Sequence, residues 1–233
     1  MTKVASQQLI DLRGEVLSLG ARLIESIPRA TVILLEQDME AAEFQILSDD
    51  EFDSRTLALE DRSITLMALH APVATELRRA VVVMKMSSEL ERSADLVTNL
   101  CKVARRIFGH PLDPRLRGLI GRMSDQARLE IEYVLSAYAD DDLAKAQSID
   151  KLDEHLDHLQ REFIQAVFEC NSAGTLDLPL GVQMAITARF FERIGDHAVN
   201  MARLVEFQVT GKLPPARAHS LVLENSTTGS GPT

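Results

Sequence analysis

Two nine-residue stretches of the chain share one pattern of charged and polar residues. ERSADLVTN occupies residues 91–99 and ERIGDHAVN occupies residues 192–200, and both read E-R-x-x-D-x-x-x-N. The offset between the two stretches is 101 residues for the glutamate, the aspartate and the asparagine alike. Self-similarity at a fixed offset is typical of an internal repeat. The chain is therefore predicted to contain two copies of one structural unit.

The sequence around both stretches has the periodicity of amphipathic helices. Apolar residues recur at spacings of three and four, as in the series Leu9, Leu12, Val16, Leu19. The 233 residues include only 11 Gly, 8 Pro and no Trp, so residues that favour turns or strands are scarce. The fold class is predicted to be all-α, with long helices over residues 4–36, 39–69, 73–107 and 179–209. Two further helices are marked by apolar stripes over residues 116–138 and 149–166, the second starting near residues 140–142. A break in the apolar stripe at residues 48–50 permits a bend in the second of them.

One segment divides these helices into two groups of three. Residues 109–114 read GHPLDP, with one Gly and two Pro in six residues, and they interrupt the helical pattern. Long helices joined by short connections pack antiparallel. We expect two tandem antiparallel three-helix bundles related by internal pseudo-symmetry, over residues 1–108 and 115–211, with 109–114 as the connecting loop. The polar residues 212–233 are predicted to form a disordered tail.

The charge balance and the cysteines exclude several classes of protein. The chain has 35 acidic and 25 basic residues and a net charge of −10, which argues against a nucleic-acid partner. No apolar run approaches the length needed to cross a bilayer, and the N-terminus lacks the apolar core of a signal peptide. Cys101 and Cys170 form no CxxC pair, which favours reduced core thiols. These features predict a cytoplasmic protein that meets membranes only peripherally.

The repeated motif places two carboxylates and one amide on a single helix face. Glu91, Asp95 and Asn99 are spaced i, i+4 and i+8, so that neighbouring Cβ atoms lie about 5–6 Å apart. The second copy repeats this spacing with Glu192, Asp196 and Asn200. Like charges at i, i+4 repel each other. A bound cation would remove that repulsion in both copies.

The preceding helix of the first half carries a second pair of acids. Asp49 and Asp53 precede the turn near Pro72 by the same number of residues by which Asp95 and Glu91 follow it. In an antiparallel pair of helices, such residues lie level with each other. The sequence therefore places Asp53 level with Glu91 and Asp49 level with Asp95, on neighbouring turns of the first bundle.

The second half offers the same arrangement. Asp153 and Asp157 lie at about the height of Glu192 across the loop at residues 171–175. Clustered carboxylate and amide oxygens suit hard cations such as Mg²⁺, Mn²⁺ and Ca²⁺, or carboxylate-bridged iron. His197 would add a nitrogen and favour Fe or Zn, but a solvated or core position for this histidine is the favoured interpretation. A divalent-metal site is predicted in each half, and an ordinary solvated acidic face is the alternative.

The histidines of the sequence do not fit two catalytic classes that helical bundles can form. Di-iron oxidases and ferritin-like proteins need Glu-x-x-His pairs, and none of the six histidines has a Glu three residues before it. Histidine phosphotransfer would use His155 or His158, but His155 lies in the acidic run DEHLD, a poor place to accept a phosphoryl group. P-loop, zinc-ribbon and Ser/His/Asp patterns are absent from the sequence. We expect no enzymatic activity.

Three segments resemble the PhoU family of phosphate-signalling regulators. They are PVATELR (residues 72–78), LERSADLVTN (residues 90–99) and ARFFERIGDHAVNMA (residues 188–202), and the resemblance extends over about residues 8–211. The first motif departs from the family pattern, since Ser93 and Ala94 stand where Ile and Gly are usual. Glu76 stands where the family usually has Asp.

The resemblance implies both a fold and a site. PhoU proteins are pairs of three-helix bundles whose E/D-x-x-x-D motifs bind metal. On that basis the metal ligands are Glu91, Asp95, Glu192 and Asp196, with Asp53 and Asp153 in support and with Asn99, Asn200, Asp49 and Asp157 as further candidates. The implied ion is divalent, and the candidates for its identity are Mg, Mn, Fe and Zn.

The resemblance also implies a role and partners. The role is that of a cytoplasmic negative regulator of the phosphate-starvation response. Its implied partners are the ATPase of a phosphate ABC transporter and a sensor histidine kinase, and it could form a homodimer. The alternative is a PhoU-like accessory protein of a phosphate permease without a kinase partner.

Overall fold

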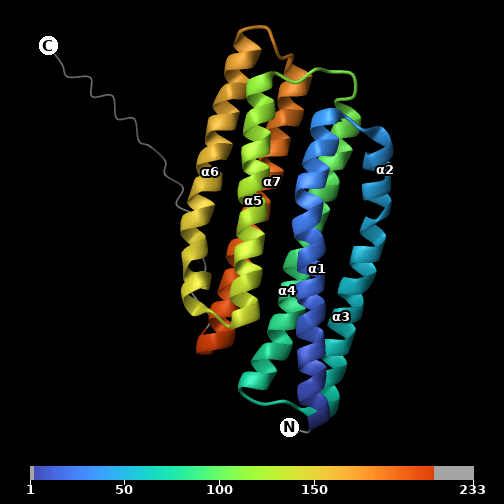
Figure 1. Ribbon diagram of the computed structural model, residues 1–233, viewed down its shortest axis with the longest axis vertical. Coiled ribbons are helices and arrows are strands. Elements are labelled where there is room, and N and C mark those ends of the chain that lie inside the picture. Colours follow the sequence, from blue (N-terminus) through green and yellow to red (C-terminus); the bar gives the residue numbers. More distant parts are fainter. Residues whose placement is uncertain (1–2, 213–233) are drawn as a thin grey trace, which may run out of the picture.

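A computed structural model describes residues 3–212, which fold into seven helices without a strand (Figure 1). Their bounds are α1 Lys3–Glu36, α2 Met39–Leu47, α3 Asp49–His70, α4 Thr75–Arg106, α5 Pro114–Asp140, α6 Leu143–Ser172 and α7 Leu178–Thr210. The all-α prediction is confirmed, and the helices group as two three-helix bundles in which α2 and α3 together make one arm. Of the tail predicted over residues 212–233, residues 213–233 lie outside the described part of the chain.

The second predicted helix is two helices, because the chain breaks at Ser48. The Ser48 backbone N–H donates to the Phe44 carbonyl at 3.0 Å and closes α2. The first turn of α3 then carries Asp49, Asp50 and Glu51. Acidic side chains in a first turn are stabilised by the positive end of the helix dipole. The bend permitted at residues 48–50 is therefore a full helix boundary, and it places Asp49 at the start of α3.

Aspartates begin the three helices of the second half. Asp113, Asp142 and Asp177 each accept a hydrogen bond from a backbone N–H of the first turn of α5, α6 and α7, at 2.8, 3.0 and 2.8 Å. Such caps satisfy donors that have no partner within the helix. Pro114 and Pro179 add a backbone angle already suited to a first turn. These local signals fix where each helix begins, and so the heights of the acidic residues on α6 and α7.

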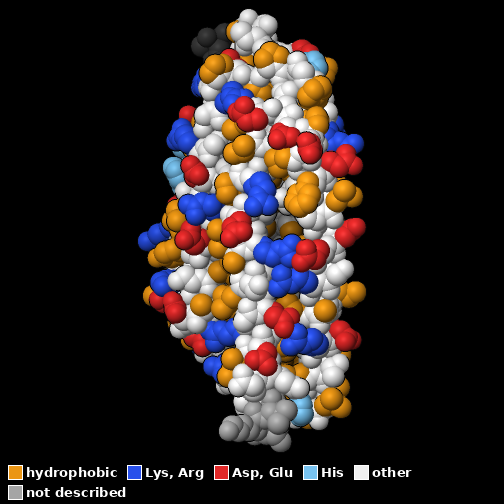
Figure 2. Space-filling view, turned by 45° about the vertical axis from the view of Figure 1, so that its right-hand side comes forward, with side chains coloured by type: hydrophobic (Ala, Val, Ile, Leu, Met, Phe, Trp, Pro, Cys, Tyr) orange, Lys and Arg blue, Asp and Glu red, His pale blue; other side chains and the backbone are white. Residues whose placement is uncertain are grey.

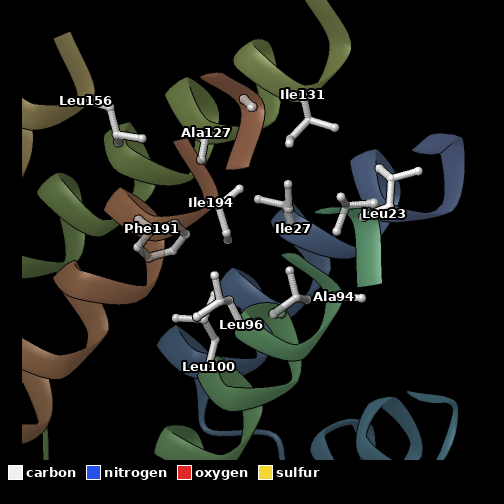
Figure 3. Close-up of a cluster of buried hydrophobic side chains, with 14 of the residues drawn as sticks. Leu23, Ile27, Ala94, Leu96, Leu100, Ala127, Ile131, Leu156, Phe191 and Ile194 are labelled. Atoms are coloured by element: carbon white, nitrogen blue, oxygen red, sulfur yellow. The ribbon is translucent and has the colours of Figure 1, made fainter. Parts of the chain in front are cut away.

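The two halves share one hydrophobic core. Side chains of α1, α4, α5, α6 and α7 meet in it, among them Leu23, Leu100, Ile131, Leu156 and Phe191 (Figure 3). At Gly20 of α1, a Cβ would lie 2.3 Å from Leu135 Cδ1 of α5, so the absence of a side chain allows the two helices their close approach. The two halves therefore pack against each other as one body and are not separate globular units.

The internal repeat is visible in the buried positions. Residues of α1 correspond to residues of α5 at an offset of 104, and both members of each pair are buried: Leu12 and Leu116, Val16 and Ile120, Leu23 and Ala127, Ile27 and Ile131. The same offset relates α3 to α6, as in Phe52 and Leu156 or Leu59 and Phe163. Between α4 and α7 the offset is 101, as in Leu90 and Phe191. The pseudo-symmetry allows each position of one half to be compared with its counterpart.

Charged side chains on the surface contribute little to the stability of the fold. Acidic and basic side chains are interspersed along the face shown in Figure 2. Arg22 of α1 donates to Glu51 of α3 at 2.6 Å, and Arg62 of α3 pairs with Glu15 of α1. Exposed ion pairs of this kind contribute about 0–1 kcal/mol each. Among residues 3–212, no helix carries an apolar stretch that would reach across a bilayer.

Candidate metal centre

The four acidic residues predicted in the first half lie together where α3 meets α4, and we call them the first carboxylate cluster. Asp49 and Asp53 come from the start of α3, and Glu91 and Asp95 come from α4. Burial raises the pKa of Asp49, Asp53 and Glu91, and Asp95 raises all three further by charge repulsion. A hydrogen bond from the Thr98 hydroxyl acts in the opposite direction on Asp49. The level matching predicted from the sequence thus brings these carboxylates within reach of each other's charge.

The second half contains an equivalent group, which we call the second carboxylate cluster. It consists of Asp153 and Asp157 from α6 and Glu192 and Asp196 from α7. Burial raises the pKa of Glu192 to about 7, and the carboxylates of Asp196, Asp157 and Asp153 contribute to the same shift, whereas Arg189 opposes it. Asp153 is 1 % exposed, so the cluster reaches into the protein interior.

A fifth acid of the second half, Glu130 of α5, was missed by the sequence analysis. Its side chain is fully buried, and its Oε1 accepts a hydrogen bond from Gln126 Nε2 at 2.9 Å. Its Oε2 is buried and has no hydrogen-bond partner within the described residues. Burial raises the pKa of Glu130 to about 8, and Asp153, Asp157 and Asp196 contribute in the same direction. The signal in the sequence was a glutamate three residues after Ala127 and four before Val134, within the apolar stripe.

The glycine of the second motif makes this crowding of carboxylates sterically feasible. A Cβ built on Gly195 would lie 2.7 Å from Asp153 Oδ1 and 2.8 Å from Glu130 Oε2. Real Cβ atoms essentially never approach oxygens this closely, so any larger residue would displace one of the two carboxylates. Gly195 therefore lets side chains of α5 and α6 reach the backbone of α7 beside Asp196.

The asparagines of the motif do not share one role. Asn200 Nδ2 donates to Glu89 Oε2 at 3.2 Å, and His197 Nδ1 lies 2.7 Å from the same oxygen. Burial alone would raise the pKa of Glu89, but the hydrogen bonds from His197 and Asn200, together with nearby positive charge, outweigh it and lower the pKa. Asn200 and the buried His197 thus contact α4 of the first half, a pairing that the sequence analysis missed. Asn99 is half-buried on α4.

The donor chemistry of the clusters fits a hard cation. Their side chains are carboxylates, and two carboxylate oxygens, Glu130 Oε2 and Glu192 Oε2, are buried without a hydrogen-bond partner among the described residues. Burial raises the pKa of Cys101 to about 12, so this thiol is protonated at neutral pH in the metal-free protein. Within residues 3–212, no three side chains of His, Cys, Asp or Glu are already arranged to hold one ion. Carboxylates of a cluster would therefore have to turn toward a cation to bind it.

Comparison with known proteins identifies the family to which the chain belongs. The model of the PhoU domain matches the chain twice, over residues 16–104 and 120–205. The chain belongs to the PhoU family. The two matched PhoU domains begin 104 residues apart, which is the offset that relates α1 to α5.

Curated PhoU relatives match over most of their length. The "Phosphate-specific transport system accessory protein PhoU homolog 2" of Mycobacterium tuberculosis is 32% identical over 211 residues, which are 89% of this chain and 95% of the relative. A PhoU homolog of Caulobacter vibrioides is 27% identical over 212 residues, 90% of this chain and 91% of the relative. The chain is thus similar to complete PhoU proteins rather than to one domain of them.

Two crystal structures of PhoU proteins share the fold. The protein from Streptococcus pneumoniae has a TM-score of 0.83 at 24% identity and is 99% covered, and it matches 91% of this chain. The protein from Pseudomonas aeruginosa has a TM-score of 0.83 at 23% identity, with 99% and 89% covered. The paired three-helix bundles are therefore the PhoU architecture.

The PhoU repeat pairs each acidic residue with a counterpart, and it shows where the halves differ. At the offset of 104, Asp49 corresponds to Asp153 and Asp53 to Asp157. The same offset pairs Glu130 with Ser26, and the offset of 101 pairs Gly195 with Ala94. Beside Ser26 and Ala94 lies a cavity of about 190 Å³. The first PhoU domain is therefore open at the place where the second is filled by a buried glutamate.

Proposed function

We propose that the protein is a metal-binding regulatory adaptor of phosphate transport. In this role it would negatively regulate phosphate uptake and the phosphate-starvation response. It would do so by linking a phosphate ABC transporter, through its ATPase, to a sensor histidine kinase. The proposal includes no catalysis by this chain.

The observation that carries the proposal is the match to PhoU over both halves. The curated relatives are described as accessory proteins of a phosphate-specific transport system, and they match about nine-tenths of the chain. This coverage supports the same role for this chain, because both bundles and the segment between them are retained. The kinase link rests on the resemblance of the motifs alone.

The carboxylate clusters support the metal-binding part. In the first cluster Glu91 and Asp95 would hold the ion with Asp49 and Asp53, and in the second Glu192 and Asp196 would hold it with Asp153 and Asp157. A divalent cation would neutralise carboxylates that burial and mutual repulsion now make costly to ionise. Because each cluster joins two helices, an ion would also fix their relative position and so the surface offered to a partner.

Deleting the gene tests the regulatory role. Phosphate uptake and phosphate-starvation transcripts should both stay high in medium rich in phosphate, and a plasmid copy should restore repression. If uptake rises while the transcripts stay repressed, the alternative holds, namely an accessory protein of a permease without a kinase partner. If neither changes, the regulatory proposal is wrong.

Metal binding is tested on the purified chain. Titration calorimetry with Mn²⁺ should detect binding that is lost in a variant combining Glu91→Gln, Asp95→Asn, Glu192→Gln and Asp196→Asn. The matched control is Glu154→Gln, an exposed acid on α6 beside the second cluster. Binding that survives the quadruple variant would contradict the assignment.

A further inference from the structure

Glu130 is an unusual residue for the middle of a helical core. Its side chain is fully buried on α5, where its neighbours along the stripe are Ala127, Ile131 and Val134. Only one of its two oxygens is satisfied, by Gln126. Leaving a buried polar group without a partner costs about 1–3 kcal/mol. A residue that adds such a cost within an apolar stripe calls for a function.

The unpartnered oxygen points into the second carboxylate cluster. Glu130 Oε2 and Asp153 Oδ1 both lie within 3 Å of the point where a Cβ of residue 195 would stand. That point lies beside the helix backbone next to Asp196. Oxygens from α5 and α6 therefore converge at the motif of α7, and the charges of Asp153, Asp157 and Asp196 all act on Glu130.

At the position equivalent to Glu130, the first half has no buried carboxylate, and the glutamate of α1 that lines the cavity there, Glu25, is exposed. The corresponding position of α1 is Ser26, whose side chain lines the cavity of about 190 Å³. Ala94 lines the same cavity in place of the second half's glycine. The first cluster thus draws four carboxylates from two helices, whereas the second can draw five from three helices.

We propose that Glu130 is an additional carboxylate ligand of the cation in the second cluster and that the two halves therefore bind cations unequally. The inference rests on the proposed metal binding and goes beyond the E/D-x-x-x-D motifs. Added carboxylate ligands and ligand rigidity raise the affinity of a site for hard divalent cations. The second cluster is then the tighter site, and its ion also ties α5 to α6 and α7. The first cluster is the weaker site, which fills at higher cation concentration.

The test titrates Mn²⁺ alone into the full chain and measures binding by titration calorimetry. The wild type should show a tight and a weak class of sites. Glu130→Gln keeps the shape and the acceptor for Gln126 but removes the charge, and it should weaken the tight class by about tenfold or more and leave the weak class unchanged. Glu132→Gln, an exposed position on the same helix, should change neither class. Glu91→Gln should weaken only the weak class.

The outcomes separate this inference from the function on which it rests. If the wild type binds no Mn²⁺, the metal-binding part of the proposed function fails. If the wild type binds Mn²⁺ and Glu130→Gln binds both classes as tightly, Glu130 is a protonated core residue and only the inference fails. Circular dichroism without metal shows whether the variant is folded. As a second measurement, Mn²⁺ anomalous scattering from wild-type crystals should place an ion in contact with Glu130, and an ion bound elsewhere would overturn the assignment.

Discussion

The Glu89 carboxylate of α4 lies 2.7 Å from Nδ1 of His197 on α7, and this contact joins the two halves of the molecule. Asn200 donates to the same carboxylate oxygen, so two residues of the second motif hold one residue of the first bundle. The motif ERIGDHAVN therefore serves two purposes. Glu192 and Asp196 belong to the second carboxylate cluster, and His197 and Asn200 hold α7 against α4.

Replacing Glu89 by Gln should destabilise the protein by about 1–3 kcal/mol at pH 7, because it removes a charged partner of His197 and Asn200. The pKa of Glu89 is lowered in the folded state from its ordinary value of 4.5. Its contribution to stability is therefore present above that value and is lost as the pH falls through the folded pKa. Urea denaturation of wild type and variant from pH 7 down to pH 4 measures the difference. The exposed Glu43→Gln of α2 is the control, and an equal effect of the two substitutions at pH 7 would contradict the assignment.

Gly195→Ala should destabilise the protein by about 1–3 kcal/mol, because the new methyl group would collide with the oxygens of Asp153 and Glu130 and with Leu156. It should also weaken Mn²⁺ binding. Gly121→Ala is the matched control, since its Cβ would meet nothing within 4 Å. Alanine is the better helix former, so the control should be neutral or more stable by up to about 1 kcal/mol. Thermal unfolding and calorimetry measure both, and equal effects of the two changes would refute the steric account.

In the absence of divalent ions, the protein should lose stability as the pH rises from about 5 to 8. Burial raises the pKa of Glu192 to about 7 and that of Glu130 to about 8. The unfolded chain releases these protons near pH 4.5, whereas the folded state holds them, so rising pH favours unfolding within this window. Melting temperatures with EDTA measure the decline. Glu130→Gln should flatten it, and adding Mn²⁺ at pH 8 should restore the wild type more than this variant. A melting temperature that rises across the window would exclude these shifts.

Gly20→Ala should cost about 1–3 kcal/mol, because the methyl group would overlap Leu135 at the contact between α1 and α5. Leu135→Ala creates space there, so the double variant should be more stable than the sum of the two single effects predicts. Chemical denaturation of the four proteins gives the coupling energy. A coupling near zero would show that the helices do not meet at this pair.

The helices and their two groups could be predicted because the responsible signals are local. The spacing of apolar residues and the Gly/Pro segment at 109–114 indicate helices and a division without any knowledge of packing. The break at Ser48 was only suggested, since a helix boundary depends on a few hydrogen bonds that the apolar stripe does not reveal. The acid pairs of neighbouring helices could be matched in height because an antiparallel hairpin has a simple geometry.

Two features of the site could not be predicted in this way. Glu130 joins the second cluster from α5, which is not the hairpin partner of α7, and its distance from Asp153 depends on how three helices cross. The contact of Glu89 with His197 depends on how one bundle docks on the other. The spacing of residues within one helix predicts neither the approach of Glu130 to Asp153 nor the contact of Glu89 with His197. An acid within an apolar stripe is the signal that would have directed attention to Glu130.

The single core has a consequence for how the molecule can be divided. Cutting the chain between α4 and α5 would expose a broad hydrophobic surface on each fragment. This surface lies around Ile27 on one fragment and around Ile131 on the other. We expect such fragments to aggregate or to reassociate with each other rather than to stay monomeric in solution. Because the two bundles share one core, a substitution that disturbs the packing of one bundle should also destabilise the other.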